Sequence, residues 1–224
     1  MSSFPVVVKV GTERSEKCWL YWFARDRPPE EKSSELSNFD LAGGNPPKLS
    51  LPGWHLLQVS HNTTGFTPDL NLVGQFICVA AVPVDSHENT GIPLLHSLPK
   101  PVDEGPTDCI FEKRIQMTPD FLKNMDYRVV SYNVLAQLYV KPGPDGYFPY
   151  CSPQAIDKDY RYPLLLKEIA GYHADIICLQ EVDVSLQFSF LEPYLREMGY
   201  SLAFCKKQGL VNEGSSIIYR NSRL

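Results

Sequence analysis

An asparagine and a glutamate stand at the ends of two apolar runs, and both are suited to chemistry on a phosphate. Glu181 follows the run 176–180, so a central strand there would bring its carboxylate to the rim of a sheet. A carboxylate in that position needs a cation, a basic side chain or hydrogen-bond donors. Mg²⁺ binds one or two carboxylates together with phosphate oxygens and water. Glu181 is therefore a candidate Mg²⁺ ligand, with a solvated loop glutamate as the alternative.

Asn133 ends the other run, which contains Val129 and Val130. An amide is poorly suited to a buried strand unless it has hydrogen-bond partners. It could bind a phosphate oxygen or orient an attacking water without adding charge that repels the substrate. The sequence predicts Asn133 and Glu181 as catalytic candidates, while a cap or turn role remains the alternative for Asn133.

Other reactive side chains are weaker candidates. Asp183 would share the face of Glu181 if the strand continued that far, but we expect a solvated charge in the following loop. His173 precedes the strand, and we expect it to be exposed. The six cysteines form no CxxC pair, which argues against structural zinc, and they are typical of reduced thiols. Cys18 and Cys78 leave the question of a disulfide open.

Periodicity predicts the elements that would position these residues. The second half of the chain changes from strand to helix patterns and back, which indicates a mixed α/β domain over 127–224. Helical spacing of apolar residues ends at Gly171 and again at Gly199. We expect strands at 128–134, 176–179, 200–204 and 216–219, and helices around 162–169 and 191–198.

The first half predicts a β-rich accessory domain over 1–95. Short strand-like runs separated by turn sequences favour a small β-sandwich, and an immunoglobulin-like topology is one interpretation. Prolines between Ile92 and Pro106 predict a linker without helix or strand. Thr118 could cap a short helix in the connecting segment, which completes a linker region over 96–126. We expect strands at 6–10, 18–23, 54–59 and 73–82.

Composition restricts the class of protein. The chain has 224 residues, 43% hydrophobic content and a formal net charge of −5, which suits a globular protein. Its acidic balance argues against a clamp for duplex DNA, but allows an enzyme that binds a single-stranded oligonucleotide through one or two phosphates. No run approaches the roughly 18 apolar residues of a membrane span, and no signal or transit peptide is evident.

The motifs around Asn133 and Glu181 occur in an order that resembles a known family. They resemble the opening half of the deadenylase-like branch of the endonuclease/exonuclease/phosphatase superfamily. The segment Phe66 to Asp69, with Gly74 and Cys78, also resembles the accessory domain of the 2′,5′-phosphodiesterases in that branch. The motifs in the second half are Ser131–Ala136, Tyr150–Cys151, Asp159–Arg161, Leu166–Ile169, Ala174–Asp183 and Glu213–Arg220.

The resemblance implies a fold and a reaction. The fold would be α+β, with a β-rich, sandwich-like domain followed by the first half of a deoxyribonuclease I-like α/β two-sheet sandwich. Glu181 would hold Mg²⁺ and Asn133 would lie beside the scissile phosphate. The substrates would be 2′,5′-oligoadenylate or the poly(A) end of RNA. The resemblance also implies a monomer in the mitochondrial matrix, with the cytoplasm as the alternative.

The later motifs of the family are missing. Neither its Gly-Asp-Phe-Asn segment nor its C-terminal Ser-Asp-His segment occurs in this sequence. These segments supply the general acid and base in the family, so we expect a truncated catalytic domain that is inactive alone. The alternative is a non-catalytic protein whose β-rich module binds RNA or another partner.

Overall fold

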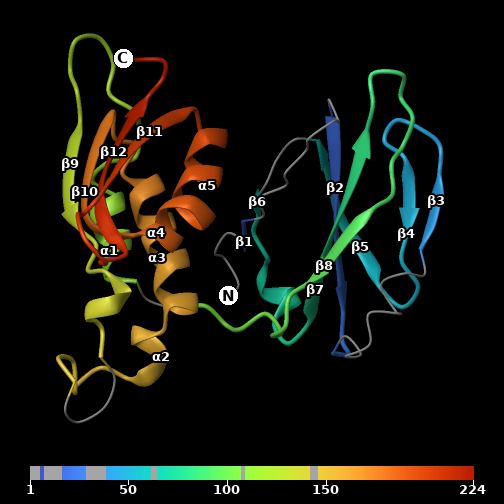
Figure 1. The fold of residues 1–224 in the computed structure, drawn as a ribbon, viewed down its shortest axis with the longest axis horizontal. Coiled ribbons are helices and arrows are strands. Elements are labelled where there is room, and N and C mark those ends of the chain that lie inside the picture. Colours follow the sequence, from blue (N-terminus) through green and yellow to red (C-terminus); the bar gives the residue numbers. More distant parts are fainter. Residues whose placement is uncertain (1–5, 8–16, 29–38, 62–64, 107–108, 142–145) are drawn as a thin grey trace. The chain divides into compact units, whose positions relative to one another are not determined.

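The computed structural model describes residues 6–7, 17–28, 39–61, 65–106, 109–141 and 146–224. These residues fall into two compact units that divide between Gly105 and Pro106, except that Val6–Val7 belongs to the second unit (Figure 1). No described helix is long and apolar enough to cross a membrane. The domain boundaries at 95 and 126 remain predictions.

The first unit is built on an antiparallel four-stranded sheet. Its strand order is β5-β2-β7-β8, and a small hairpin of β3 and β4 accompanies it. The strands are β2 (Lys17–Arg25), β3 (Asp40–Ala42), β4 (Lys48–Ser50), β5 (His55–His61), β7 (Phe76–Val84) and β8 (Leu94–Ser97). The short elements of this unit are β6 (Gly65–Phe66) and the 3₁₀ helix η2 (Leu70–Leu72), whereas β1 (Val6–Val7) belongs to the second unit.

One apolar cluster joins this sheet to the hairpin. Tyr21 and Phe23 of β2 pack with Leu49 of β4 and Trp54, because alternate residues of a strand share one face. The predicted strands at 18–23, 54–59 and 73–82 are confirmed as β2, β5 and most of β7, whereas the one at 6–10 lies mostly outside the described residues. The sandwich remains a prediction.

The pairing register of β2 and β7 separates Cys18 from Cys78. Phe23 of β2 pairs with Cys78 of β7, and Cys18 pairs with Pro83, so the two cysteines are not opposite each other. Both are buried free thiols. Burial raises the pKa of Cys78 to about 12, so its thiol stays protonated at neutral pH.

Two predictions for the linker region were wrong. Leu94–Ser97 forms strand β8, because its backbone continues the ladder of β7 despite the neighbouring prolines. The short helix is α1 (Ile110–Ile115), which ends before Thr118 instead of starting there. The Thr118 hydroxyl donates to the Ile115 carbonyl, so this residue closes a helix end.

The second unit is mixed α/β, as predicted. Its sheet has the order β11-β12-β10-β9, in which only β9 and β10 are parallel. The strands are β9 (Val129–Asn133), β10 (Ile176–Asp183), β11 (Tyr200–Lys206) and β12 (Glu213–Arg220). Besides α1, the helices are η3 (Gln137–Tyr139), α2 (Pro153–Ile156), α3 (Lys158–Gly171), α4 (Val184–Leu186), η4 (Gln187–Leu191) and α5 (Glu192–Glu197).

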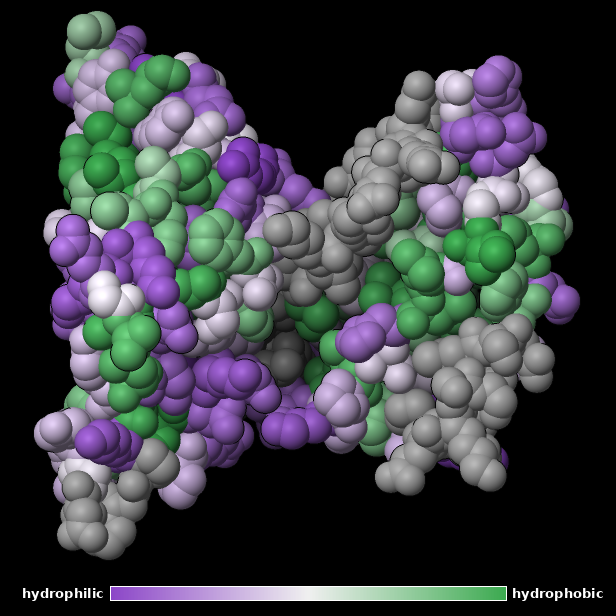
Figure 2. All heavy atoms as spheres, viewed as in Figure 1, coloured by the Kyte–Doolittle hydropathy of each residue, from purple (hydrophilic) through white to green (hydrophobic). Residues whose placement is uncertain are grey.

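The core of this unit lies on one face of its sheet. Leu166 and Ile169 of α3 pack with Ile177 and Leu179 of β10, and all four are almost completely buried. Strand residues of the opposite parity are more exposed, and Ile217 of β12 is 52% exposed. In Figure 2 hydrophobic side chains reach the surface over the strands of this unit. The helices therefore cover one face, and among the described residues none covers the other.

Candidate active site

Asn133 and Glu181 meet where β9 and β10 end. The two strands run in parallel, and Asn133 pairs with Gln180, the residue before Glu181. The Asn133 Nδ2 donates to Glu181 Oε1 at 2.7 Å. Two side chains that are 48 positions apart in the sequence thus lie at one edge of the sheet. Asn133 is exposed and Glu181 is half-buried, so a ligand could reach both.

A break in β10 explains why Glu181 points to the rim. Leu179 and Val182 are both in the helix-covered core, although regular alternation would place residues three apart on opposite faces. The ladder to β12 shifts register between these two residues, and Glu181 has a positive φ of 55°. The extra residue lets both apolar side chains reach the core. Their burial therefore turns the carboxylate of Glu181 out of the core.

The orientation of the Asn133 amide is fixed at both ends. Its Oδ1 accepts a hydrogen bond from the Leu135 backbone N–H at 2.9 Å, while its Nδ2 faces Glu181. Leu135 has a positive φ of 56°. Leucine rarely adopts this conformation, so the backbone at Leu135 is locally strained. Contacts with the surrounding residues must stabilise it.

Asp183 is buried and was wrongly predicted as a solvated loop charge. It ends β10 and is 7% exposed. Its Oδ2 accepts from the Gln137 backbone N–H at 2.7 Å and from the Tyr162 hydroxyl at 2.9 Å. Burial, with the Asp183 charge in addition, raises the pKa of Tyr162 to about 12. Asp183 thus fastens the chain after β9 to β10.

Glu213 is a second buried acid at this edge. It pairs with Asp183 across the β10–β12 ladder and is 3% exposed. The Lys207 ammonium lies 2.9 Å from its Oε1 and compensates the charge. Both buried acids therefore have partners, which leaves Glu181 as the accessible carboxylate.

His173 lies at the other end of β10. It is half-buried instead of exposed, its Nδ1 is 2.8 Å from the Thr118 carbonyl oxygen, and its ring contacts Phe121 edge-on. Strand β10 begins at Ile176 and spans eight residues, so Glu181 is on the order of 20 Å away. His173 has no part in this site.

The donor atoms suit a hard cation. Within the part of the chain that the structure describes, no group of three His, Cys, Asp or Glu residues could hold a metal ion. Mg²⁺ does not need such a group, because it keeps several waters and binds one or two carboxylates together with phosphate oxygens. Glu181 supplies an accessible carboxylate and Asn133 an amide, so these residues fit a Mg²⁺–phosphate site better than a closed protein cage.

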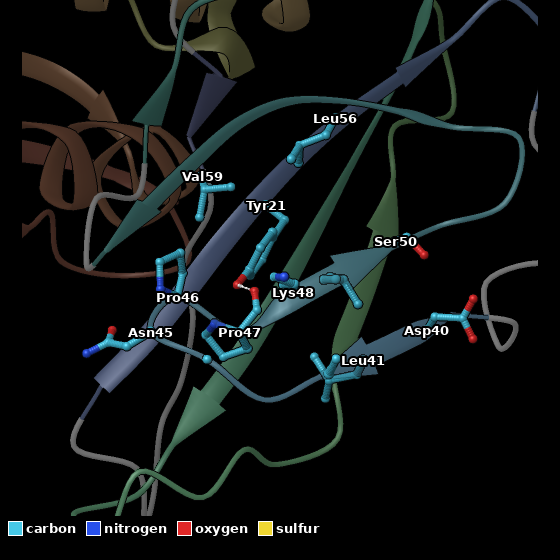
Figure 3. A pocket seen from close by; sticks show the side chains of 13 residues that line it. Tyr21, Asp40, Leu41, Asn45, Pro46, Pro47, Lys48, Ser50, Leu56 and Val59 are labelled. Carbon is cyan, nitrogen blue, oxygen red and sulfur yellow. Dashed lines mark hydrogen bonds between the residues drawn. The ribbon is translucent and has the colours of Figure 1, made fainter.

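A separate hollow in the first unit has a different character. It is an open depression of about 700 Å³ between the β3–β4 hairpin and the sheet, with Leu41, Leu56 and Val59 among its lining residues (Figure 3). The Tyr21 hydroxyl donates to the Pro47 carbonyl oxygen at its wall. Asp40 and Lys48 are the charged residues among those that line it. This hollow is suited to binding an apolar group.

The chain is similar in sequence to several known proteins. No family model matches the chain. The chain is 30% identical over 227 residues to 2′,5′-phosphodiesterase 12 of Mus musculus and 30% over 226 residues to the Homo sapiens protein of that name. Both matches span all of this chain and 36% of the relative. Protein angel homolog 2 of Danio rerio is 35% identical over 98 residues, which are 44% of this chain and 17% of that protein.

Two solved structures are also similar. ANGEL2, titled a 2′,3′-cyclic phosphatase, is 27% identical with a TM-score of 0.38, covering 43% of this chain and 27% of that one. The human Nocturnin catalytic domain is 27% identical with a TM-score of 0.32, covering 43% of this chain and 33% of that one. The sequence matches confirm the predicted family: the chain is a homologue of 2′,5′-phosphodiesterase 12 and the angel proteins, within the endonuclease/exonuclease/phosphatase superfamily.

The positive φ of Glu181 predicts that a glycine at this position stabilises the fold more than an alanine does. Residues other than glycine lose about 1 kcal/mol in this conformation. We therefore expect Glu181→Gly to have a higher free energy of unfolding than Glu181→Ala, by up to about 1 kcal/mol, although glycine is the more flexible residue. Urea unfolding of both variants measures the difference. A more stable alanine variant would show that Glu181 does not occupy this backbone conformation.

Proposed function

We propose that Asn133 and Glu181 form part of the site of a Mg²⁺-dependent phosphodiesterase and 3′-exoribonuclease. Its substrates would be single-stranded 2′,5′-oligoadenylate and poly(A) RNA. The observation that carries this proposal is the hydrogen bond between the Asn133 amide and the accessible Glu181 carboxylate where β9 and β10 end. Homology over the whole chain to proteins named 2′,5′-phosphodiesterase 12 supports it. The chain spans 36% of the length of these relatives.

Each residue has a separate task in this proposal. Glu181 holds the cation, because its carboxylate is accessible and its partner among the described residues is the neutral Asn133 amide. Asn133 donates a hydrogen bond to a phosphate oxygen, which binds the anion without adding charge next to Glu181. When bound, Mg²⁺ polarises the phosphate and stabilises the negative charge that develops as water attacks.

These residues provide only part of the chemistry. Hydrolysis also needs groups that activate water and protonate the leaving oxygen. Asp183 and Glu213, the acids at the adjoining ends of β10 and β12, are buried and already have partners. We therefore propose that the 224-residue chain binds substrate but turns it over very slowly. The exposed face of the sheet, which includes Val129 and Ile217, supports a role for further structure beside this unit.

Binding of a fluorescent 2′,5′-linked oligoadenylate tests this proposal. We expect Mg²⁺ to strengthen binding and Asn133→Ala to weaken it by roughly tenfold or more, since a hydrogen bond to a charged group contributes about 1.5–3 kcal/mol. Fluorescence anisotropy of the whole chain, with and without Mg²⁺, measures both effects. Product formation in the same samples is expected to be close to background.

Asn221→Ala is the matched control. Asn221 is also exposed and belongs to the same unit, but it follows β12 at the opposite end of the sheet, where β10 begins. Its replacement should leave binding unchanged. Binding that is independent of both Mg²⁺ and Asn133 would contradict the proposed site, and rapid turnover by this chain would contradict the proposed incompleteness.

A second candidate function is binding of RNA or a protein partner by the first unit. The hollow between the hairpin and the sheet favours it. Leu56 lines this hollow and is 49% exposed, so Leu56→Glu should abolish enhancement of the fluorescence of an apolar dye such as anilinonaphthalene sulfonate. The control is Leu70→Glu, because Leu70 is 64% exposed and does not line the hollow. Equal fluorescence in both variants would remove the observation that favours this candidate.

A further inference from the structure

Arg161 of α3 reaches the segment that follows β9. Its Nη1 donates to Gln137 Oε1 at 2.7 Å. Its Nη2 donates to the carbonyl oxygens of Val134 at 2.9 Å and Leu135 at 2.8 Å. All three acceptors belong to residues 134–137, which we call the site loop because it begins next to Asn133.

The acceptors of Arg161 are neutral, which is unusual for a half-buried cation. Burial is the main cause that lowers the pKa of Arg161, and the nearby Asp183 charge opposes this effect. A cation in this position gains little stability unless its hydrogen bonds are well oriented. The guanidinium offers several donors in a fixed plane, so it can hold three oxygens at once, whereas a lysine ammonium is a compact point charge. The hydrogen bonds of Arg161 therefore fix the position of the site loop more than they compensate a charge.

A single peptide unit connects Arg161 to Asn133. The carbonyl group that Arg161 binds on Val134 belongs to the same planar unit as the N–H of Leu135. In a trans peptide the C=O and N–H point in opposite directions. When Arg161 holds the oxygen, the N–H is directed away from it, and here it donates to Asn133 Oδ1 at 2.9 Å.

The positive φ of Leu135 makes this support necessary. At 56° the residue would favour another conformation without external contacts. Arg161 binds the carbonyl groups on both sides of the Leu135 φ and ψ angles. The far end of the site loop is fastened separately, because the Gln137 N–H donates to Asp183.

We infer that Arg161 is a positioning residue for Asn133. It holds the Val134–Leu135 peptide plane, so that Leu135 fixes one end of the Asn133 amide and the other end faces Glu181. Its importance for binding rests on the function proposed above, but the geometry can be tested without metal or substrate.

Nuclear magnetic resonance of the Asn133 side-chain amide tests the geometry. Its two N–H signals are assigned by their loss in Asn133→Ala. We expect Arg161→Lys to move them toward the values of a free amide, while the backbone signals of β10 and β12 keep their positions. Arg196→Lys is the matched control, since Arg196 forms an exposed ion pair with Glu192 on α5 and should leave the Asn133 signals unchanged.

Oligoadenylate binding then distinguishes a positioning role of Arg161 from a general effect on the stability of the fold. In the presence of Mg²⁺ we expect Arg161→Lys to weaken binding by roughly 10-fold, and by far less in the Asn133→Ala background, because both changes act on one hydrogen bond. Equal weakening in both backgrounds would overturn the inference. Unchanged Asn133 amide signals in folded Arg161→Lys would also overturn it.

A second variant is used if Arg161→Lys does not fold. Arg161→Gln keeps an amide donor without charge, and the same measurements apply. If neither variant folds, Arg161 acts on global stability and the inference is wrong. If the wild type binds no oligoadenylate at all, the proposed function fails, but the amide signals still decide whether Arg161 positions Asn133.

Discussion

The break in strand β10 is the constraint on which the candidate site depends. Leu179 and Val182 must both enter the core, although they are three positions apart. A regular strand cannot bury both, so one residue is extruded and Glu181 takes a positive φ. The parallel pairing of β9 with β10 then brings Asn133 beside it. Apolar packing thus determines where the accessible carboxylate lies.

The acidic residues at the two ends of β10 have different partners. Asp175, just before the strand, is fully buried and forms an ion pair with Arg220 at 2.7 Å. Glu181 at the other end has the neutral Asn133 amide as its partner among the described residues. The first arrangement compensates a charge and ties the sheet together. The second leaves a carboxylate able to accept a cation, which is why this end is the better candidate for chemistry.

The sequence predicted the parts of this arrangement that depend on local patterns. Apolar periodicity correctly located α3 and the strands of the sheet, and the ends of the apolar runs predicted Asn133 and Glu181 as candidates, which the structure brings into contact. It did not predict the hydrogen bonds of Arg161 or the burial of Asp183, because both depend on contacts between α3 and the ends of the strands. Prolines near β8 hid a strand whose partner is elsewhere in the chain.

The most direct test uses Mn²⁺ as a paramagnetic substitute for Mg²⁺ in nuclear magnetic resonance spectra of the whole chain. The account predicts that low Mn²⁺ concentrations first broaden the backbone signals of Val134, Gln180 and Val182, the neighbours of Asn133 and Glu181. Glu181→Gln should remove this selective broadening while the fold is kept. Broadening that persists in Glu181→Gln, or that begins at another group of acids, would contradict the claim that Glu181 holds the metal.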